Sequence, residues 1–327
     1  MVDYAWAMLW LTRLVVGGSG IGAVALAVLY AFQERLIYIP KIPGIPSNYE
    51  YSPSDFHLEY EDVDLTAKDG TKLHAWYLHP MGWGKATRRQ RPTILFFQEN
   101  AGNMTFRLPF LKLLARYLDC SIFAPSYRGY GRSQGQPNEA GIKLDAQAAL
   151  EHLLERKDVN KDLIVVLGKS LGGAVALHLA SSNPEAFKAV VIENTFLSIE
   201  DVAPKMLPFL GPVLGRGKLG NFLIRNKWRN YEAIKKLQHI PMLMLSAGQD
   251  EIVPSAHMKA LYEEVGGPGN TRITWVDFPD AHHNDVYEIA SVRYWPAILA
   301  FFQQHVPLDG ADASCEPVPP KIMPQKL

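Results

Sequence analysis

The chain has 327 residues, of which 48% are hydrophobic and 20% are charged, a composition typical of a globular protein with a large core. Lys plus Arg and Asp plus Glu both number 33, so the chain is neutral overall and lacks the positive charge that indicates a nucleic-acid-binding protein. Its two cysteines, Cys120 and Cys315, are too few and too distant for a disulfide scaffold or a zinc site.

An uncharged segment runs from Leu14 to Phe32, between Arg13 and Glu34. A helix of this length, at about 1.5 Å per residue, spans the roughly 30 Å of a bilayer core. A cleaved signal peptide would be shorter and would need a small-residue cleavage site. A buried soluble helix is the other alternative. We predict a single-pass membrane anchor in residues 1–35, in the endoplasmic reticulum or another endomembrane.

The segment after the anchor, residues 36–58, is rich in proline and polar residues, which predicts a linker. Two alternating segments around an Asp-Gly turn, 59–66 and 72–79, predict an antiparallel hairpin. A basic loop is expected at 88–92.

From residue 93 onward, short apolar segments alternate with helical ones. The predicted strands are 93–98, 121–125, 163–167, 189–192, 242–246 and 273–278. The predicted helices are 108–118, 141–156, 171–181, 255–265 and 286–305. This alternation indicates a mainly parallel sheet with helices on both faces, in a domain of residues 59–306. The insertion at 197–237 is interpreted as a lid, and residues 307–327 as a disordered tail.

The strongest local motif is Gly168-Lys169-Ser170-Leu171-Gly172, which follows an apolar strand and opens a helix. This context is typical of a nucleophile elbow, in which the serine is exposed on a strained turn and the glycines permit close backbone approach. The helix N-terminus behind the serine favours developing negative charge. The motif predicts an α/β-hydrolase fold with Ser170 as the nucleophile.

A serine nucleophile needs a histidine base and a carboxylate that orients the base, and in this fold the acid and then the histidine follow the serine along the chain. Asp250 lies just beyond the strand at 242–246 and is preferred to its neighbour Glu251, which is further from the strand end. His282 and His283 both follow the last strand. Spacing alone does not choose between these two histidines.

Two backbone N–H groups are expected to stabilise the oxyanion of the tetrahedral intermediate. One belongs to Leu171, the residue after the nucleophile. The other is assigned to Asn100, in the loop after the strand at 93–98. No metal and no organic cofactor is implied by this set of residues.

Several segments resemble the family of the α/β-hydrolase domain-containing protein 13 and the fungal bud-emergence proteins. They include GKSLGGAVALHLA, ENTFLSIEDVAP and the HND triplet at 283–285, and the resemblance extends over about residues 60–302. It implies a single-pass, membrane-anchored hydrolase whose HND histidine is the base, which corresponds to His283. The shared segment at 127–133 is expected to brace a strand–helix turn through hydrogen bonds of Arg128.

One position departs from the family pattern. Relatives generally have His-Gly where this chain has Gln98-Glu99. A carboxylate beside an oxyanion is unfavourable unless its side chain turns away, and glycine adopts conformations that glutamate reaches less easily. This departure from the family pattern therefore predicts that the activity of this chain can be reduced or altered by Glu99.

These observations together predict a membrane-anchored serine hydrolase, an esterase or thioesterase that cleaves carboxylic ester or thioester bonds through an acyl-enzyme. The anchor and the apolar lid favour an acyl ester, a lipid or an S-acylated protein as substrate. The alternative is a weakly active or inactive scaffold or signalling protein with the same fold. Glu99 is the main support for this alternative, and the intact set of Ser170, Asp250 and His283 argues against it.

Overall fold

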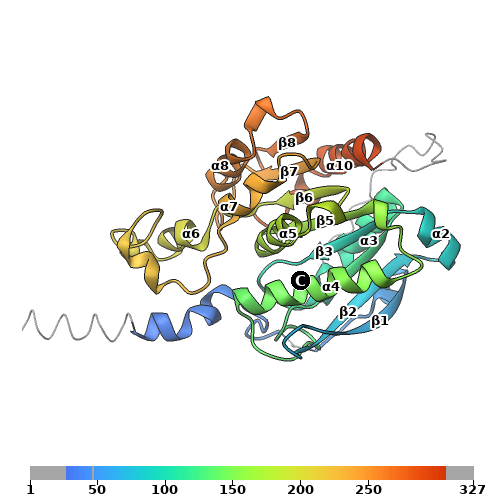
Figure 1. Ribbon diagram of the computed structural model, residues 1–327, viewed down its shortest axis with the longest axis horizontal. Coiled ribbons are helices and arrows are strands. Elements are labelled where there is room, and N and C mark those ends of the chain that lie inside the picture. Colours follow the sequence, from blue (N-terminus) through green and yellow to red (C-terminus); the bar gives the residue numbers. More distant parts are fainter. Residues whose placement is uncertain (1–26, 46–47, 307–327) are drawn as a thin grey trace, which may run out of the picture.

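A single twisted sheet runs through the centre of the protein (Figure 1). The structure is a computed structural model, and it describes residues 27–45 and 48–306. The strands, in chain order, are β1 (Leu58–Thr66), β2 (Lys72–Pro80), β3 (Thr93–Phe97), β4 (Ser121–Pro125), β5 (Ile164–Lys169), β6 (Ala189–Glu193), β7 (Met242–Ala247) and β8 (Ile273–Phe278). Their spatial order is β1-β2-β4-β3-β5-β6-β7-β8.

Most of this sheet is parallel. β1 and β2 form the predicted antiparallel hairpin, and β2 pairs antiparallel with β4. Every pair from β4 to β8 is parallel, so the carboxyl ends of these strands meet at one edge of the sheet. The predicted hairpin and the mainly parallel sheet are confirmed.

Helices pack on both faces of the sheet. They are α2 (Lys85–Gln90), α3 (Leu108–Leu118), α4 (Glu139–Glu155), α5 (Leu171–Ser182), α6 (Ile199–Met206), α7 (Asn230–Ile234), α8 (Ala256–Glu264), α9 (Val286–Ile289) and α10 (Ser291–His305). One buried cluster joins α4, α5 and α8 to the sheet, and a second cluster joins α3 and α10 to the opposite face. Adjacent strand residues such as Val165 and Val166 fall in different clusters, because successive side chains of a strand point to opposite faces.

Two sequence-based assignments are wrong in detail. The basic loop at 88–92 overlaps helix α2, and Arg88 is buried there because it pairs with Glu61 at 2.7 Å and with Asp158 at 3.2 Å. The single helix predicted at 286–305 is two helices. The backbone of Ala290, with φ −98° and ψ 22°, leaves the helical conformation between them, while its carbonyl accepts the N–H groups of Arg293 and Tyr294 in α10.

The described chain begins in a helix that occupies residues 27–37 (Figure 1). Most of the predicted anchor, residues 1–26, lies outside the described residues, as do 307–327 of the predicted tail. Within the part that the structure describes, no helix is both long enough and apolar enough to cross a bilayer. The residues predicted as a linker are packed against the domain: Tyr38 is buried, and Ile39 exchanges backbone hydrogen bonds with the loop at 100–102.

The segment interpreted as a lid connects β6 to β7. It contains α6, the short 3₁₀ helices Pro208–Leu210 and Leu219–Leu223, α7 and a final 3₁₀ turn at Lys235–Leu237. In Figure 1 the outer part of this segment and the helix at 27–37 project from the same end of the molecule. The lid therefore lies beside the first described helix, although the hydrogen-bonded residues Gln33 and Leu223 are 190 positions apart in the chain.

Candidate active site

Ser170 lies on the sharp turn between β5 and α5. Its backbone has φ 53° and ψ −116°, a left-handed φ that costs energy for a residue other than glycine. The turn is held by the bond from the Ser170 N–H to the Glu193 carbonyl at 2.8 Å and by the Thr195 hydroxyl, which donates to the Ser170 carbonyl at 2.7 Å. The strain is therefore maintained by β6 and the residues that follow it.

The glycines of the motif are required by contact. A Cβ atom on Gly168 would lie 2.0 Å from the carbonyl oxygen of Gly172, and a Cβ atom on Gly172 would lie 2.0 Å from that of Phe97. Both are backbone atoms, which a rotamer change does not move. Strand β5, helix α5 and strand β3 thus approach too closely for any side chain at these two positions.

Three side chains that are far apart in sequence converge at the carboxyl edge of the sheet. The Ser170 hydroxyl lies 3.0 Å from Nε2 of His283, and Nδ1 of His283 lies 2.6 Å from Oδ2 of Asp250. All three residues are buried. The other oxygen of Asp250 accepts the N–H groups of Ile252 and Val253 at 3.0 and 2.7 Å, so the carboxylate is fixed in the orientation that holds the imidazole.

The two rival residues pair with each other on the surface. Nδ1 of His282 lies 3.2 Å from Oε2 of Glu251, and both side chains are 57% exposed. This second histidine–carboxylate pair is therefore turned away from Ser170, and the structure places His283 rather than His282 beside the serine.

The two expected oxyanion donors face the same cavity as Ser170. Leu171 is the first residue of α5, and Asn100 lies in the loop after β3; both line the pocket together with the serine. Neither backbone N–H has an acceptor among the described residues. The other groups of Asn100 are occupied, because its carbonyl accepts the Tyr130 hydroxyl at 2.7 Å and its amide donates to the Ile37 carbonyl at 3.0 Å.

The Glu99 carboxylate lies in a buried cluster of charges. Its Oε2 lies 2.5 Å from Nε of Arg107, although the two groups lack hydrogen-bond alignment, and its Oε1 lies 3.7 Å from Nζ of Lys169. Lys169 is also 3.0 Å from Glu193. Burial raises the pKa of Glu99, but the charges of Arg107 and Lys169 outweigh burial and hold that pKa below its usual value.

The backbone of Glu99 also needs no glycine. Among the described residues with positive φ, the oxyanion loop contributes only Gly102, with φ 72°. The objection that glutamate replaces a conformationally special glycine therefore does not apply to this chain.

Two supports of the site were not assigned from the sequence. The Asn194 side chain donates to the His283 carbonyl at 2.9 Å and accepts from the Ala247 N–H at 2.8 Å, so it ties the histidine loop to the end of β7. The Tyr127 hydroxyl donates to the Gln98 carbonyl at 2.9 Å and so braces the oxyanion loop. Tyr127 and Asn194 lie in the family segments at 127–133 and 193–204, and this shared sequence was the signal from which their roles could have been found. Arg128, expected to act as a brace, binds Asp145 and Asp69.

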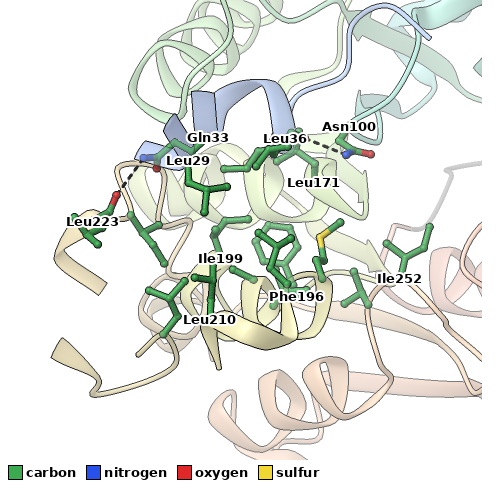
Figure 2. A pocket seen from close by; sticks show the side chains of 18 of the residues that line it. Leu29, Gln33, Leu36, Asn100, Leu171, Phe196, Ile199, Leu210, Leu223 and Ile252 are labelled. Carbon is green, nitrogen blue, oxygen red and sulfur yellow. Dashed lines mark hydrogen bonds between the residues drawn. The ribbon is translucent and has the colours of Figure 1, made fainter. Parts of the chain in front are cut away.

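An apolar pocket of about 290 Å³ leads away from Ser170 (Figure 2). Leu29, Gln33 and Leu36 of the first described helix form one side, and Ile199 and Leu210 of the lid lie opposite. Its volume is close to the lower bound of about 300 Å³ for small-molecule sites, which are mostly apolar with a few polar groups. Within the described residues, no group of three or more His, Cys, Asp or Glu side chains is arranged to hold a metal ion.

Comparison with known proteins gives consistent matches. Residues 92–212 match the family model described as the alpha/beta hydrolase fold. The chain is 42% identical to alpha/beta hydrolase domain-containing protein WAV2 of Arabidopsis thaliana, over 94% of this chain and 97% of that protein. It is 37% identical to protein bem46 of Schizosaccharomyces pombe, over 80% of this chain and 83% of that protein.

A membrane protein of Saccharomyces cerevisiae, YNL320W, is 35% identical over 90% of this chain and 98% of its own length. Among solved structures, the Pyrococcus furiosus esterase Pf2001 superposes with a TM-score of 0.63 and covers 82% of this chain and 97% of the esterase. The identity to that esterase is 18%, so this similarity bears on the fold alone.

Proposed function

The chain belongs to the bud-emergence-type family of α/β-hydrolases, the family of WAV2 and bem46, and from that premise we propose that it is a serine hydrolase that cleaves carboxylic ester or thioester bonds. The observation that carries the proposal is the continuous chain of contacts from Ser170 through His283 to Asp250, with distances of 3.0 and 2.6 Å. These lie within the hydrogen-bond reach that a nucleophile and its base require.

The reaction follows from the positions of the groups. His283 takes the proton of Ser170 while the serine oxygen attacks the acyl carbonyl, and the N–H groups of Leu171 and Asn100 stabilise the oxyanion. The imidazolium then gives its proton to the departing alkoxide or thiolate, which leaves an acyl-enzyme. Water, activated by His283, releases the acid and restores the serine. Asp250 holds the tautomer of the imidazole and stabilises its charge.

The substrate we propose carries an apolar acyl group, as in an acyl ester, a lipid or an S-acylated protein. The pocket beside Ser170 supports this choice, because leucine, isoleucine, valine and phenylalanine side chains supply most of its wall. We also propose that the chain is a single-pass membrane protein of the endoplasmic reticulum or another endomembrane. The uncharged segment from Leu14 to Phe32 and the membrane protein among the relatives support this location.

The mechanism is tested by labelling with a fluorophosphonate, which reacts with an activated serine. We expect Ser170→Ala, His283→Ala and Asp250→Asn to abolish or strongly reduce labelling and ester hydrolysis while the fold is kept. His282→Ala and Glu251→Ala are the matched controls, since they remove the neighbouring histidine–carboxylate pair. Equal loss in both sets, or labelling of the wild type that is no faster than that of folded Ser170→Ala, would contradict the proposal.

The alternative of an inactive scaffold rested on the carboxylate of Glu99. That carboxylate lies beside two cations, Arg107 and Lys169, and their positive charge offsets its repulsion of an oxyanion. We favour the enzyme for this reason.

A further inference from the structure

The surface around the pocket mouth is unusually apolar. Five of the residues that line the pocket are also large, apolar and exposed: Tyr30, Leu36, Met206, Val213 and Ile252. Beyond them, the lid exposes Phe209 by 68%, Leu219 by 93% and Phe222 by 76%, and none of these three lines the pocket. The described chain exposes sixteen large apolar side chains, and ten of them lie on the helix at 27–37, on the lid or at Ile252.

This concentration indicates a surface that is covered in the working protein, because contiguous exposed apolar patches mark sites of protein or membrane contact. The exposed lid residues are neighbours of the pocket along the chain. Phe209 precedes Leu210 and Phe222 precedes Leu223, and both Leu210 and Leu223 line the pocket. Leu219 precedes Gly220, whose N–H donates to the Val213 carbonyl at 3.0 Å. Because five exposed apolar residues themselves line the pocket, its mouth opens among these exposed side chains.

The helix at 27–37 is fixed to the lid by several hydrogen bonds. The Gln33 side chain donates to the Leu223 carbonyl at 3.1 Å and accepts the Arg225 N–H at 2.7 Å. Glu34 accepts from the Asn226 side chain at 3.1 Å and pairs with the Arg225 guanidinium. The helix and the lid thus form one unit around the mouth, as Figure 2 shows for the bond between Gln33 and Leu223.

The chain that enters this unit indicates what covers the patch. No charged residue occurs between Leu14 and Phe32, and the last six residues of that uncharged segment, 27–32, already belong to the helix that lines the pocket. Val28 and Phe32 of this helix are exposed by 51% and 46%. A segment of this length and composition favours a bilayer as its surroundings. The exposed apolar residues around the pocket mouth therefore lie where the chain would leave the lipid.

The charges of the lid agree with a lipid surface. Between residues 202 and 231 there are six basic residues and no acidic one: Lys205, Arg216, Lys218, Arg225, Lys227 and Arg229. Four of them pair with carboxylates elsewhere, whereas Lys205 and Lys218 have no carboxylate partner among the described residues. Basic residues beside exposed aromatic and aliphatic ones are typical of elements that lie in the interface of an anionic membrane.

We propose that the lid and the helix at 27–37 form a docking surface for the bilayer, so that the acyl chain of a membrane lipid enters the pocket directly from the membrane. The bilayer-contacting residues include Phe209, Leu219 and Phe222. The acyl chain occupies the space between Leu36 and Ile199, with its ester carbon at Ser170. The choice of substrate rests on the proposed hydrolase function, whereas the docking of the lid does not.

Docking is tested without reference to activity. A polarity-sensitive fluorophore is attached to the full-length protein at Leu219→Cys. Cys315 is replaced by serine, and Cys120 is buried, so that the label reacts at position 219. The protein is reconstituted in phosphatidylcholine vesicles with and without phosphatidylglycerol. The control is the fluorophore at Val292→Cys on α10, where the native side chain is 78% exposed and outside the pocket. We expect an apolar emission shift at 219 that is larger with the anionic lipid, and aqueous emission at 292. Aqueous emission at both positions would overturn the docking.

The route of the substrate is tested with the triple variant Phe209→Ser, Leu219→Ser, Phe222→Ser. We expect it to hydrolyse a soluble short-chain ester at the wild-type rate and a vesicle-embedded long-chain ester about tenfold more slowly, because apolar contact sets interfacial affinity. The control Ile289→Ser, Val292→Ser should leave both rates unchanged. Equal rates of the triple variant and the wild type on the embedded ester, or cleavage of only an S-palmitoylated peptide, would overturn the lipid route. If the wild type hydrolyses no ester and takes no fluorophosphonate, the proposed function has failed, and the fluorophore result still decides the docking.

Discussion

Replacing Glu99 by glutamine removes one carboxylate from a buried cluster of four charges. The side chains of Glu99, Arg107 and Lys169 are 14%, 16% and 5% exposed, and removal of one partner from a buried ion pair typically costs about 3–5 kcal/mol. Here both cations keep other partners, since Arg107 donates to the Ala101 carbonyl at 2.6 Å and Lys169 remains 3.0 Å from Glu193. We therefore expect the lower value, about 3 kcal/mol.

That loss corresponds to a fall in Tm of about 6 °C, at roughly 2 °C per kcal/mol for a domain of this size. It is measured by thermal unfolding of Glu99→Gln beside Glu251→Gln, a change at a 57% exposed carboxylate that should cost less than about 1 kcal/mol. The pKa of Glu99 lies below its usual value of 4.5, so its contribution is complete above that pH. As the pH falls through the lower folded-state pKa, the contribution of the Glu99 carboxylate disappears. The Tm of Glu99→Gln should then approach the Tm of the wild type.

A second substitution at Glu99 tests whether the loop after β3 is active with glutamate at this position or is impaired by it. Glu99→Gly matches the usual family sequence, but in this chain it leaves the Arg107 guanidinium, which donates to the Ala101 carbonyl, without its carboxylate partner. We expect ester hydrolysis to fall by about tenfold, less than the roughly hundredfold loss that follows removal of an oxyanion donor. A large gain in activity, or an unchanged Tm for Glu99→Gln, would refute the argument that the cluster compensates this carboxylate.

Three further outcomes follow from the contacts. Gly172→Ala places a Cβ 2.0 Å from a carbonyl oxygen of β3, so we expect misfolding by circular dichroism, whereas Gly84→Ala, with no atom within 4 Å of the new Cβ, should fold normally. Asn194→Ala removes the donor to the His283 carbonyl, and kcat should fall about tenfold with KM unchanged. Ala203→Phe fills part of the apolar pocket, and a chain-length series should shift toward shorter acyl esters; an unchanged optimum would contradict acyl binding there.

The sharp turn that carries Ser170 could be predicted from the sequence because its constraints are local. β5, α5 and β3 approach so closely that neither Gly168 nor Gly172 can carry a side chain. These two positions therefore require glycine, and the requirement is visible in the sequence as a motif. The position of Asp250 could also be predicted, since the carboxyl ends of neighbouring parallel strands meet at one edge of the sheet.

Spacing could not choose between the two candidate histidines, because adjacent residues in a turn can point in opposite directions. Only the fold shows that His283 faces Ser170 at 3.0 Å while His282 faces Glu251 at 3.2 Å. Asn194 was missed for a related reason, since its partners are 89 and 53 residues away in sequence. A polar side chain leaves no sequence pattern for such distant hydrogen bonds.

The region between the predicted anchor and the sheet shows that composition alone can mislead. Its proline and polar residues predicted a spacer, yet Tyr38 is 2% exposed and donates to Asn226 at 3.0 Å, while Trp228 donates to the Tyr38 hydroxyl at 2.9 Å. Together with the bonds from Gln33, these contacts tie the first described helix and Tyr38 to residues 223–228 of the lid. A free tether would not need such specific polar partners. Any displacement of this helix must therefore break them or move the lid with it, so the position of the helix and the width of the pocket mouth are mechanically linked.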